Sequence, residues 1–225
     1  MAGAAQGQNR GKLAIESKQV SRHYGAHGRL LEITLDIAPS ESVFVQGDRG
    51  AGKSTLLHLF ACGLLPDTGS LSIFGLDVLR QRDQAWRLVT LLPARPGVPF
   101  ETLPAWRNLA LSVELAGKIA SREELFGALD RVGLVERALE PTGRFAAMER
   151  KRLAVAGILL NPAPLVLLDD PLIDCEETLV RSLIASIVER GAALVVASSS
   201  AALRGSCGRA FTLTRGRLAP LATEQ

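Results

Sequence analysis

Short apolar runs alternate with longer amphipathic stretches along most of the chain, and the two patterns predict different elements. Four to eight apolar-rich residues bounded by turn-forming residues are typical of buried strands. Such runs occupy residues 30–37, 42–45, 71–74, 165–168 and 192–197. Apolar residues at helical spacing instead predict helices. These lie at residues 55–61, 149–160 and 177–190, and residues 210–218 fit a closing hairpin.

In the second half of the chain, the predicted strands and helices alternate. This order is typical of a mostly parallel sheet with helices on both faces, so we expect an α/β fold. Residues 83–142 have a helical pattern, but four prolines between positions 93 and 104 interrupt it. We therefore expect a helical subdomain at about residues 83–160, inserted into a single domain over residues 13–225. Residues 1–12 are polar and rich in glycine and alanine, which predicts a flexible tail.

Composition and charge exclude several classes of function. The 225 residues are 47% hydrophobic and 22% charged, as in an ordinary globular protein. A net charge of +3 with scattered arginines argues against a nucleic-acid partner. No apolar run approaches the roughly 18 residues of a membrane span, and the N-terminus lacks the hydrophobic segment of a signal peptide. The cysteines Cys62, Cys175 and Cys207 are far apart, which indicates reduced thiols in a cytosolic protein.

A glycine-rich segment between a predicted strand and a predicted helix carries the strongest chemical signal. It fits the phosphate-binding pattern G-x-x-x-x-G-K-[ST]. Its residues are Gly47, Asp48, Arg49, Gly50, Ala51, Gly52, Lys53, Ser54 and Thr55. Such glycines let backbone N–H groups curl around an anion, Lys53 supplies a positive charge for phosphates, and the Ser54 hydroxyl can ligate Mg²⁺. A purely structural turn is the alternative, but the strand and helix around it favour nucleotide binding.

The order of these parts resembles the nucleotide-binding domain of ABC-type ATPases over about residues 13–218. Besides the phosphate-binding loop, the resemblance rests on the turn at 63–70, the helix segment at 149–156 and the strand at 165–169. It implies a P-loop NTPase fold with a mostly parallel core sheet, an N-terminal antiparallel β part and an inserted helical subdomain.

The resemblance also implies roles for single residues. Asp169, at the end of a buried strand, would hold Mg²⁺ through water, and Ser54 would be a second ligand. Tyr24 lies some two dozen residues before the phosphate-binding loop, where the family places an aromatic residue that stacks on adenine. Ordinary strand packing is the other interpretation of Tyr24. Asp174 and Glu176 either occupy the place of an aspartate in the family's D-loop or cap the helix that follows, and we favour capping.

Several positions depart from the family pattern. The chain contains no Gly-Gly pair, so residues 145–149 replace the glycine-rich signature segment. No histidine follows His58, and Ser199 stands at the place of the switch histidine. No glutamine lies between positions 84 and 225, and residues 93–95 occupy the place of the loop glutamine that senses Mg²⁺ and water.

The position of the catalytic glutamate is also changed, because Asp170 follows Asp169. Aspartate keeps the charge but withdraws the carboxylate by roughly one methylene, and a general base must lie within about 2.6–3.2 Å of its water. An error near 1 Å can reduce the rate on the order of a hundredfold. Asp170 is therefore a weak general-base candidate, and we expect hydrolysis to be slow or partner-dependent.

Three functions remain open at this point. The first is an ATP-binding subunit of an ABC transporter-type complex, which would bind Mg-ATP on the cytoplasmic face of the membrane and pair with an integral membrane permease and a second nucleotide-binding chain. The second is a non-transport regulatory module of a membrane or envelope machine. The third, a DNA-repair or translation protein of the same family, is disfavoured because neither a coiled-coil insertion nor a tandem domain is present.

Overall fold

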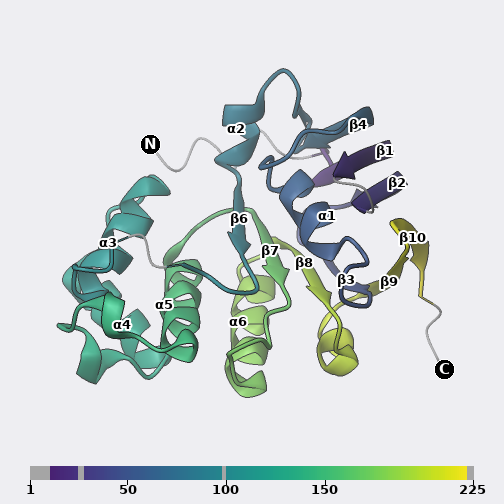
Figure 1. The fold of residues 1–225 in the computed structure, drawn as a ribbon. Helices are drawn as coiled ribbons and strands as arrows, with labels where there is room; N and C mark the ends of the chain where they lie inside the picture. The colour runs from purple at the N-terminus through teal and green to yellow at the C-terminus, as the bar shows by residue number, and fades with distance from the viewer. Residues whose placement is uncertain (1–10, 25–27, 98–99, 222–225) are drawn as a thin grey trace.

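The computed structural model describes residues 11–24, 28–97 and 100–221, and its strands and helices alternate as Figure 1 shows. Four strands form an antiparallel sheet in the order β2-β1-β4-β5. Their bounds are β1 Ile15–Tyr24, β2 Gly28–Ile37, β4 Thr68–Ile73 and β5 Leu76–Asp77. The expected N-terminal antiparallel β part is therefore present.

The second sheet has six strands in the order β10-β9-β3-β8-β7-β6. Their bounds are β3 Ser42–Gln46, β6 Val89–Leu92, β7 Leu165–Asp169, β8 Ala193–Ser198, β9 Arg209–Thr214 and β10 Arg217–Pro220. Every neighbouring pair is parallel except the closing hairpin of β9 and β10. The carboxyl ends of β3, β7 and β8 therefore meet at one edge, which places three functional segments side by side.

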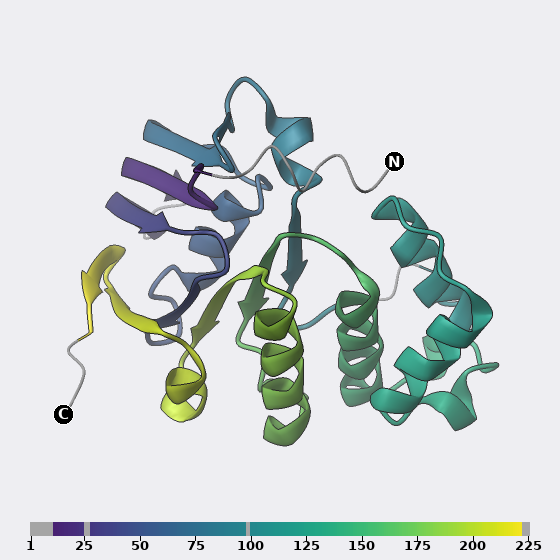
Figure 2. The ribbon, with the colours of Figure 1, turned by 180° about the vertical axis from the view of Figure 1, so that it is seen from behind.

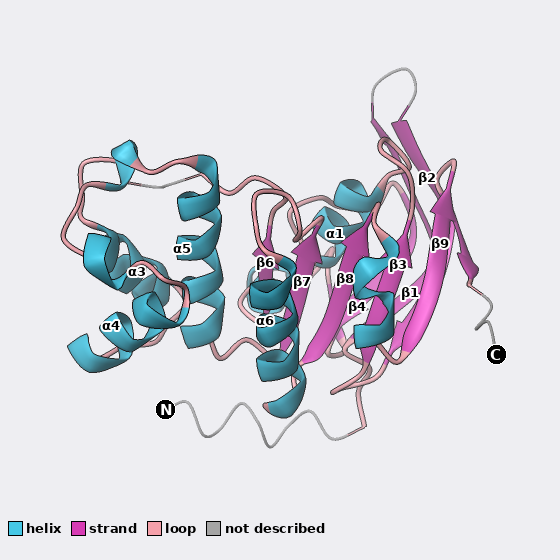
Figure 3. Cartoon of the chain, turned by 90° about the horizontal axis from the view of Figure 1, so that it is seen from below, coloured by secondary structure: helices cyan, strands magenta, loops and turns pink. Residues whose placement is uncertain are grey.

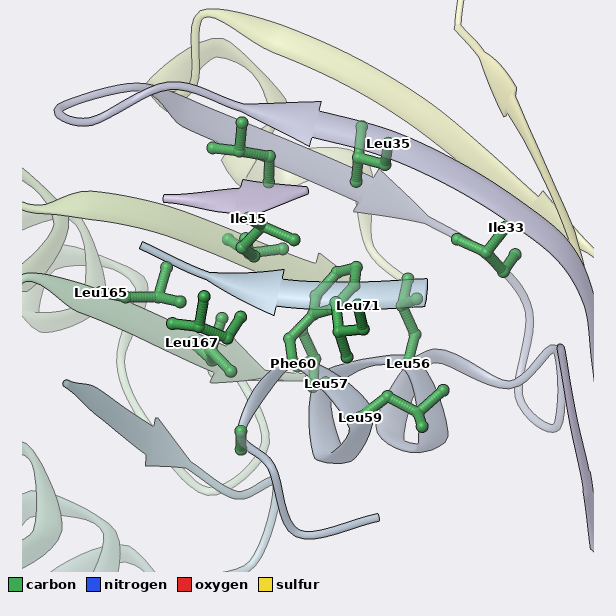
Figure 4. Close-up of a cluster of buried hydrophobic side chains, with 14 of the residues drawn as sticks. Ile15, Ile33, Leu35, Leu56, Leu57, Leu59, Phe60, Leu71, Leu165 and Leu167 are labelled. Atoms are coloured by element: carbon green, nitrogen blue, oxygen red, sulfur yellow. The ribbon is translucent and has the colours of Figure 1, made fainter. Parts of the chain in front are cut away.

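Helix α1, Lys53–Phe60, lies between the two sheets (Figure 4). Its Leu56, Leu57, Leu59 and Phe60 are fully buried. They pack against residues of both sheets, including Ile15, Leu71, Leu165 and Leu167. Full burial of each such side chain contributes about 1.5–3 kcal/mol, so α1 is held on both sides.

The opposite face of the six-stranded sheet is covered by α5 Ala147–Leu160 and α6 Glu177–Glu189, and α3 Ala105–Leu115 and α4 Arg122–Arg131 pack against α5 (Figure 2). The short helix α2 Arg82–Trp86 instead packs on the α1 side of the sheet through Ala85. Successive side chains of a strand point to opposite faces of the sheet, so each strand contributes to both hydrophobic layers. In β3, Val43 and Val45 face α1, whereas Phe44 packs with the helices on the other face. Such two-sided burial explains why β3, β7 and β8 are continuous apolar runs.

Helix α5 joins the helical part to the core sheet (Figure 3). It contacts α3 and α4 on one side and α6 and β6 on the other. Short 3-10 helices complete the connections, at Val135–Arg137, Thr142–Arg144 and Ala201–Ser206.

The sequence prediction of secondary structure fails at β6. Residues Val89–Leu92 lie in the segment that we expected to be helical, but they form the edge strand next to β7. A mostly apolar run of four residues has no periodicity that separates a strand from a helix. The runs at 30–37 and 42–45 are strands joined by a turn, as predicted, yet they belong to different sheets. The tail expected at 1–12 lies almost wholly outside the described residues.

Asn108 connects the segments on either side of α3. Its side-chain amide donates to the carbonyls of Phe100 (2.7 Å) and Leu103 (3.1 Å) and to the Thr142 hydroxyl (2.9 Å). Its carbonyl oxygen accepts from the Phe100 backbone N–H at 3.2 Å. Asn108 and Thr142 are both buried, so none of these groups has an easy replacement partner in water.

We expect Asn108→Ala to lower the free energy of unfolding by about 1–3 kcal/mol, because it leaves buried polar groups without partners. Urea denaturation followed by circular dichroism measures this loss. Ser112→Ala, on the exposed side of the same helix, is the matched control and should stay within about 0.5 kcal/mol of the parent. Equal effects of the two substitutions would show that the Asn108 network does not stabilise the fold.

Candidate nucleotide-binding site

The loop between β3 and α1 adopts a backbone that requires glycine. Gly50 and Gly52 have φ angles of +84° and +107°, in the left-handed region that other residues avoid. Gly47 meets a different constraint, because a Cβ there would lie 2.6 Å from the carbonyl oxygen of Leu213 in β9. The three motif glycines are thus needed for the path of the chain, independently of any ligand.

This loop leads directly into the N-terminus of α1. Gly52 is the N-cap and has no side chain to satisfy the free N–H groups of the first turn. Free N–H groups and the helix dipole favour an anion at this point. A pocket of about 830 Å³ opens here. Its lining residues are Arg49, Gly50, Gly52, Lys53, Ser54, Thr55, Ala94, Arg95, Asp170, Ile173 and Ser199.

Lys53 is nearly buried, with 5% of its side chain exposed, and its ammonium group is held by the loop itself. Its Nζ donates to the carbonyls of Gly47 at 2.9 Å and Asp48 at 3.2 Å. A third partner is the Asp170 carboxylate, whose Oδ2 lies 3.4 Å away. The positive charge is therefore fixed at the inner end of the pocket.

Asp169 and Ser54 form an oxygen pair beside this lysine. Asp169 is buried at the end of β7, and its Oδ1 has no hydrogen-bond partner. Burial raises the pKa of Asp169, while a hydrogen bond with the Ser54 side chain lowers it. A buried carboxylate oxygen without a partner, next to a serine hydroxyl, fits Mg²⁺, which prefers oxygen ligands and keeps several waters.

Asp170 is held differently from its neighbour. Its backbone has a φ of +36°, and its N–H donates to the carbonyl of Ala197 in β8. Its Oδ1 accepts from the Ser199 N–H at 2.8 Å and lies 3.3 Å from the Ser199 hydroxyl. The carboxylate therefore already has partners on both oxygens, Lys53 and Ser199, before any water is considered.

The sequence-predicted residues fall into two groups. The loop residues 47–55, Asp169, Asp170 and Ser199 all meet at one edge of the six-stranded sheet. Tyr24 is the last residue of β1, and its side chain lies outside the described part of the structure. The pocket lining also includes Ala94 and Arg95, from the segment 93–95 that stands in place of the loop glutamine, and Ile173, for which the sequence predicted no role.

The capping role expected for Asp174 and Glu176 is wrong. Glu176 is the N-cap residue of α6, but its side chain makes no capping hydrogen bond. It pairs instead with Arg152 of α5, and Asp174 pairs with Arg95 across 3.9 Å. The Glu176 carboxylate therefore bonds to an arginine side chain in place of a backbone N–H group, whereas the Asp174–Arg95 pair is too long to be a hydrogen bond.

The segment in place of the glycine-rich signature begins α5. Ala146 is its N-cap, and the Glu149 side chain accepts from the Ala146 N–H at 2.9 Å. Glu149 also pairs with Arg137, which lowers the pKa of Glu149. Met148 projects to the surface with 45% of its area exposed. The helix N-terminus here is thus capped by its own glutamate.

Comparison with known proteins agrees with this architecture. The family model described as ABC transporter matches residues 30–173, which is more than half of the chain. The chain therefore belongs to the ABC transporter family and is one of its ATP-binding subunits. Within the described residues, no helix is long and apolar enough to cross a membrane.

Curated relatives cover most of the chain. The lipoprotein-releasing system ATP-binding protein LolD of Hyphomonas neptunium is 33% identical over 91% of this chain and 96% of its own length. The cytochrome c biogenesis ATP-binding export protein CcmA of Methylococcus capsulatus is 31% identical over 78% and 86%. The aliphatic sulfonates import ATP-binding protein SsuB of Cupriavidus necator is 32% identical over 72% and 52%.

Solved structures share the fold at lower identity. An ATP-binding subunit of an ABC transporter superposes with a TM-score of 0.79 at 22% identity, covering 92% of this chain and 90% of its own. A dimeric ATP-binding cassette in a post-hydrolysis state, bound to ADP and phosphate, also gives 0.79 at 20% identity, covering 93% and 100%. These similarities confirm the predicted fold class.

The raised pKa of Asp169 predicts a pH-dependent stability effect. A carboxylate with a raised pKa destabilises the folded state only when ionised, so the penalty is absent below its ordinary pKa of 3.8 and grows as the pH rises through the raised value. At pH 7 we expect Asp169→Asn to increase the melting temperature of the nucleotide-free protein by about 2–4 °C. The increase should shrink toward pH 4 in thermal unfolding scans.

Asp130→Asn, an exposed aspartate on α4, is the matched control and should leave the melting temperature unchanged. A melting temperature for Asp169→Asn equal to or below that of the parent at pH 7 would contradict the assignment of Asp169 as an unpaired buried carboxylate.

Proposed function

We propose that this chain binds Mg-ATP and hydrolyses it poorly, and that it couples ATP-driven dimerisation to an integral membrane permease. The observation that supports this most is that, within one pocket, the groups for binding phosphate and Mg²⁺ are present while those for cleaving the phosphate are not. Lys53, Ser54 and Asp169 keep the geometry suited to Mg-phosphate, whereas the residues that would cleave the phosphate are replaced or already paired.

Each group in the pocket has a proposed role in binding. The N–H groups of the glycine-rich loop and of the first turn of α1 bind the phosphates, and Lys53 neutralises their charge. Ser54 and Asp169 hold Mg²⁺, Asp169 through water. Asp169 Oδ1, which has no hydrogen-bond partner, would accept from a water bound to Mg²⁺, and the ion would neutralise phosphate charge. Tyr24 stacks on adenine.

Poor hydrolysis follows from how Asp170 and Ser199 are held. A general base must accept a proton from a water, but both oxygens of Asp170 already contact Lys53 or Ser199. Ser199 has a hydroxyl where an imidazole would accept or donate a proton near neutral pH. The site is therefore suited to holding ATP, and turnover is slow or depends on a partner.

The signature segment supports the same conclusion for the dimer. An ABC dimer places this segment of one chain against the nucleotide of the other. Here the N-terminus of α5 is capped by Glu149, and Met148 covers the surface where close backbone approach would be needed. A negatively charged cap weakens the attraction of that helix end for phosphate. The second nucleotide-binding chain is either another copy or a different subunit.

The transported substrate is left open by the relatives. By their names, they serve lipoprotein release, cytochrome c biogenesis export and sulfonate import, so direction and cargo differ among them. What they share is the ATP-binding subunit. We place this chain on the cytoplasmic face of the membrane, bound to a permease. A regulatory module of an envelope machine is the second candidate, favoured by the replaced catalytic residues.

Copurification from detergent-solubilised membranes tests the permease. A tagged chain should recover a multi-span membrane protein, identified by mass spectrometry, in the presence of Mg-ATP. Recovery of soluble partners alone would remove the transporter proposal and favour the regulatory one.

Lys53→Ala tests nucleotide binding. Loss of a charged hydrogen bond to phosphate costs about 1.5–3 kcal/mol, so we expect the Kd for Mg-ATP to rise about 10- to 100-fold. Isothermal titration at constant Mg²⁺ measures the change. Lys118→Ala is the control, because Lys118 lies on the surface and pairs with Glu124 outside the pocket. Unchanged affinity in Lys53→Ala would reject the assignment of this pocket.

A further inference from the structure

Arg95 lines the nucleotide pocket together with two other cations, Arg49 and Lys53, and no role in nucleotide binding has yet been assigned to it. It lies in the loop after β6 and lines the same pocket as Lys53 and Ser54. Its side chain is 80% exposed, and its Nε lies 3.9 Å from Asp174 Oδ2. An ion pair this long and this exposed contributes little stability, so Arg95 can exchange this partner at small cost.

The loop that carries Arg95 is fixed by an unusual device. Lys151 of α5 is completely buried, and its Nζ donates to the carbonyls of Pro93 and Ala94, both at 2.9 Å. Burial lowers the pKa of Lys151 to about 8, against the raising effect of nearby acidic groups. Burying an ammonium group is unfavourable unless it is well paired. Here its hydrogen bonds fix the two residues immediately before Arg95.

The charges around the pocket define what Arg95 would bind. Asp170 is shared by Lys53 and Ser199, and Asp169 is suited to a metal ion. Arg95 lines the same pocket from the loop after β6, on a different element from Lys53. Its planar guanidinium can bind two phosphate oxygens at once, which an ammonium group cannot do.

We propose that Arg95 binds the terminal phosphate of ATP, leaving Asp174 when the nucleotide enters, and thereby gives the site its preference for ATP over ADP. The inference rests on the proposed function and deepens it. ADP lacks the phosphate that would compete with Asp174, so Arg95 stays paired with Asp174 in the ADP complex. Lys151 acts as a positioning residue, because it holds the backbone from which Arg95 reaches the pocket.

Arg95→Gln tests the proposal through the ratio of two affinities. Titration with Mg-ATP and Mg-ADP should show the Kd for ATP raised about tenfold or more, as expected for loss of a charged hydrogen bond, with the Kd for ADP unchanged. Arg95→Lys should restore part of the ATP affinity, since it keeps the charge but not the planar fork. Arg87→Gln, an exposed arginine outside the pocket, is the control and should change neither Kd.

A double-mutant cycle separates phosphate binding from a structural role. Asp174→Asn removes the competing carboxylate, so it should tighten ATP binding in the parent and have no such effect in Arg95→Gln. Lys151→Met should reduce the ATP preference when Arg95 is present and add nothing when Arg95 is absent. Circular dichroism reports whether each variant is folded. If Lys151→Met does not fold, the Arg95 variants alone decide the proposal.

The outcomes distinguish the inference from the proposed function. If the parent binds ATP through Lys53 but Arg95→Gln keeps the same ratio of ATP to ADP affinity, the role of Arg95 is rejected and the nucleotide site stands. If Arg95→Gln raises the Kd values for ATP and ADP by the same factor, Arg95 attracts both nucleotides through its charge alone. The proposed preference for ATP over ADP is then overturned. If the parent binds neither nucleotide, both proposals fail together.

Discussion

Helix α1 packs between two sheets, and the position of its first turn depends on that packing. Leu56 and Phe60 are buried against strands from both sheets, so the helix has no freedom to rotate or slide. Its N-terminus is therefore fixed beside the carboxyl ends of β3 and β7. Lys53, Ser54 and Asp169 are brought together by the apolar contacts of the residues that follow Lys53 and Ser54 in α1.

The two aspartates of the pocket differ in their partners, and this difference favours nucleotide binding over phosphate cleavage. Two adjacent aspartates end one strand, yet one has partners on both oxygens and the other keeps one oxygen unpaired. The paired residue, Asp170, stabilises the nucleotide-free pocket by holding Lys53. The unpaired residue, Asp169, destabilises it until a cation is bound. Filling such a site with Mg²⁺ and ATP stabilises the fold, because ligands that bind only the folded state shift the equilibrium toward it.

Much of the fold could be predicted because its core strands are short, mostly apolar runs bounded by turn-forming residues. β3, β7 and β8 are buried on both faces, and the motif glycines mark the loop between β3 and α1. β6 was missed because four residues at a sheet edge, one of them Thr90, are too few to show a diagnostic period. Only the parts of the site that lie in contiguous sequence motifs could be predicted. The contacts of Asp170 with Lys53 and Ser199, and of Lys151 with Pro93, join segments at least 29 residues apart, so no contiguous motif reveals them.

The state of the bound nucleotide tests the central claim most directly. The protein, in excess over Mg-ATP, is incubated for hours, and the nucleotide is then released by acid and separated by chromatography. A site that holds ATP without cleaving it returns ATP, with little ADP above the level found with Lys53→Ala. Conversion of the bound ATP to ADP within minutes by the parent, and its absence in Lys53→Ala, would contradict the account.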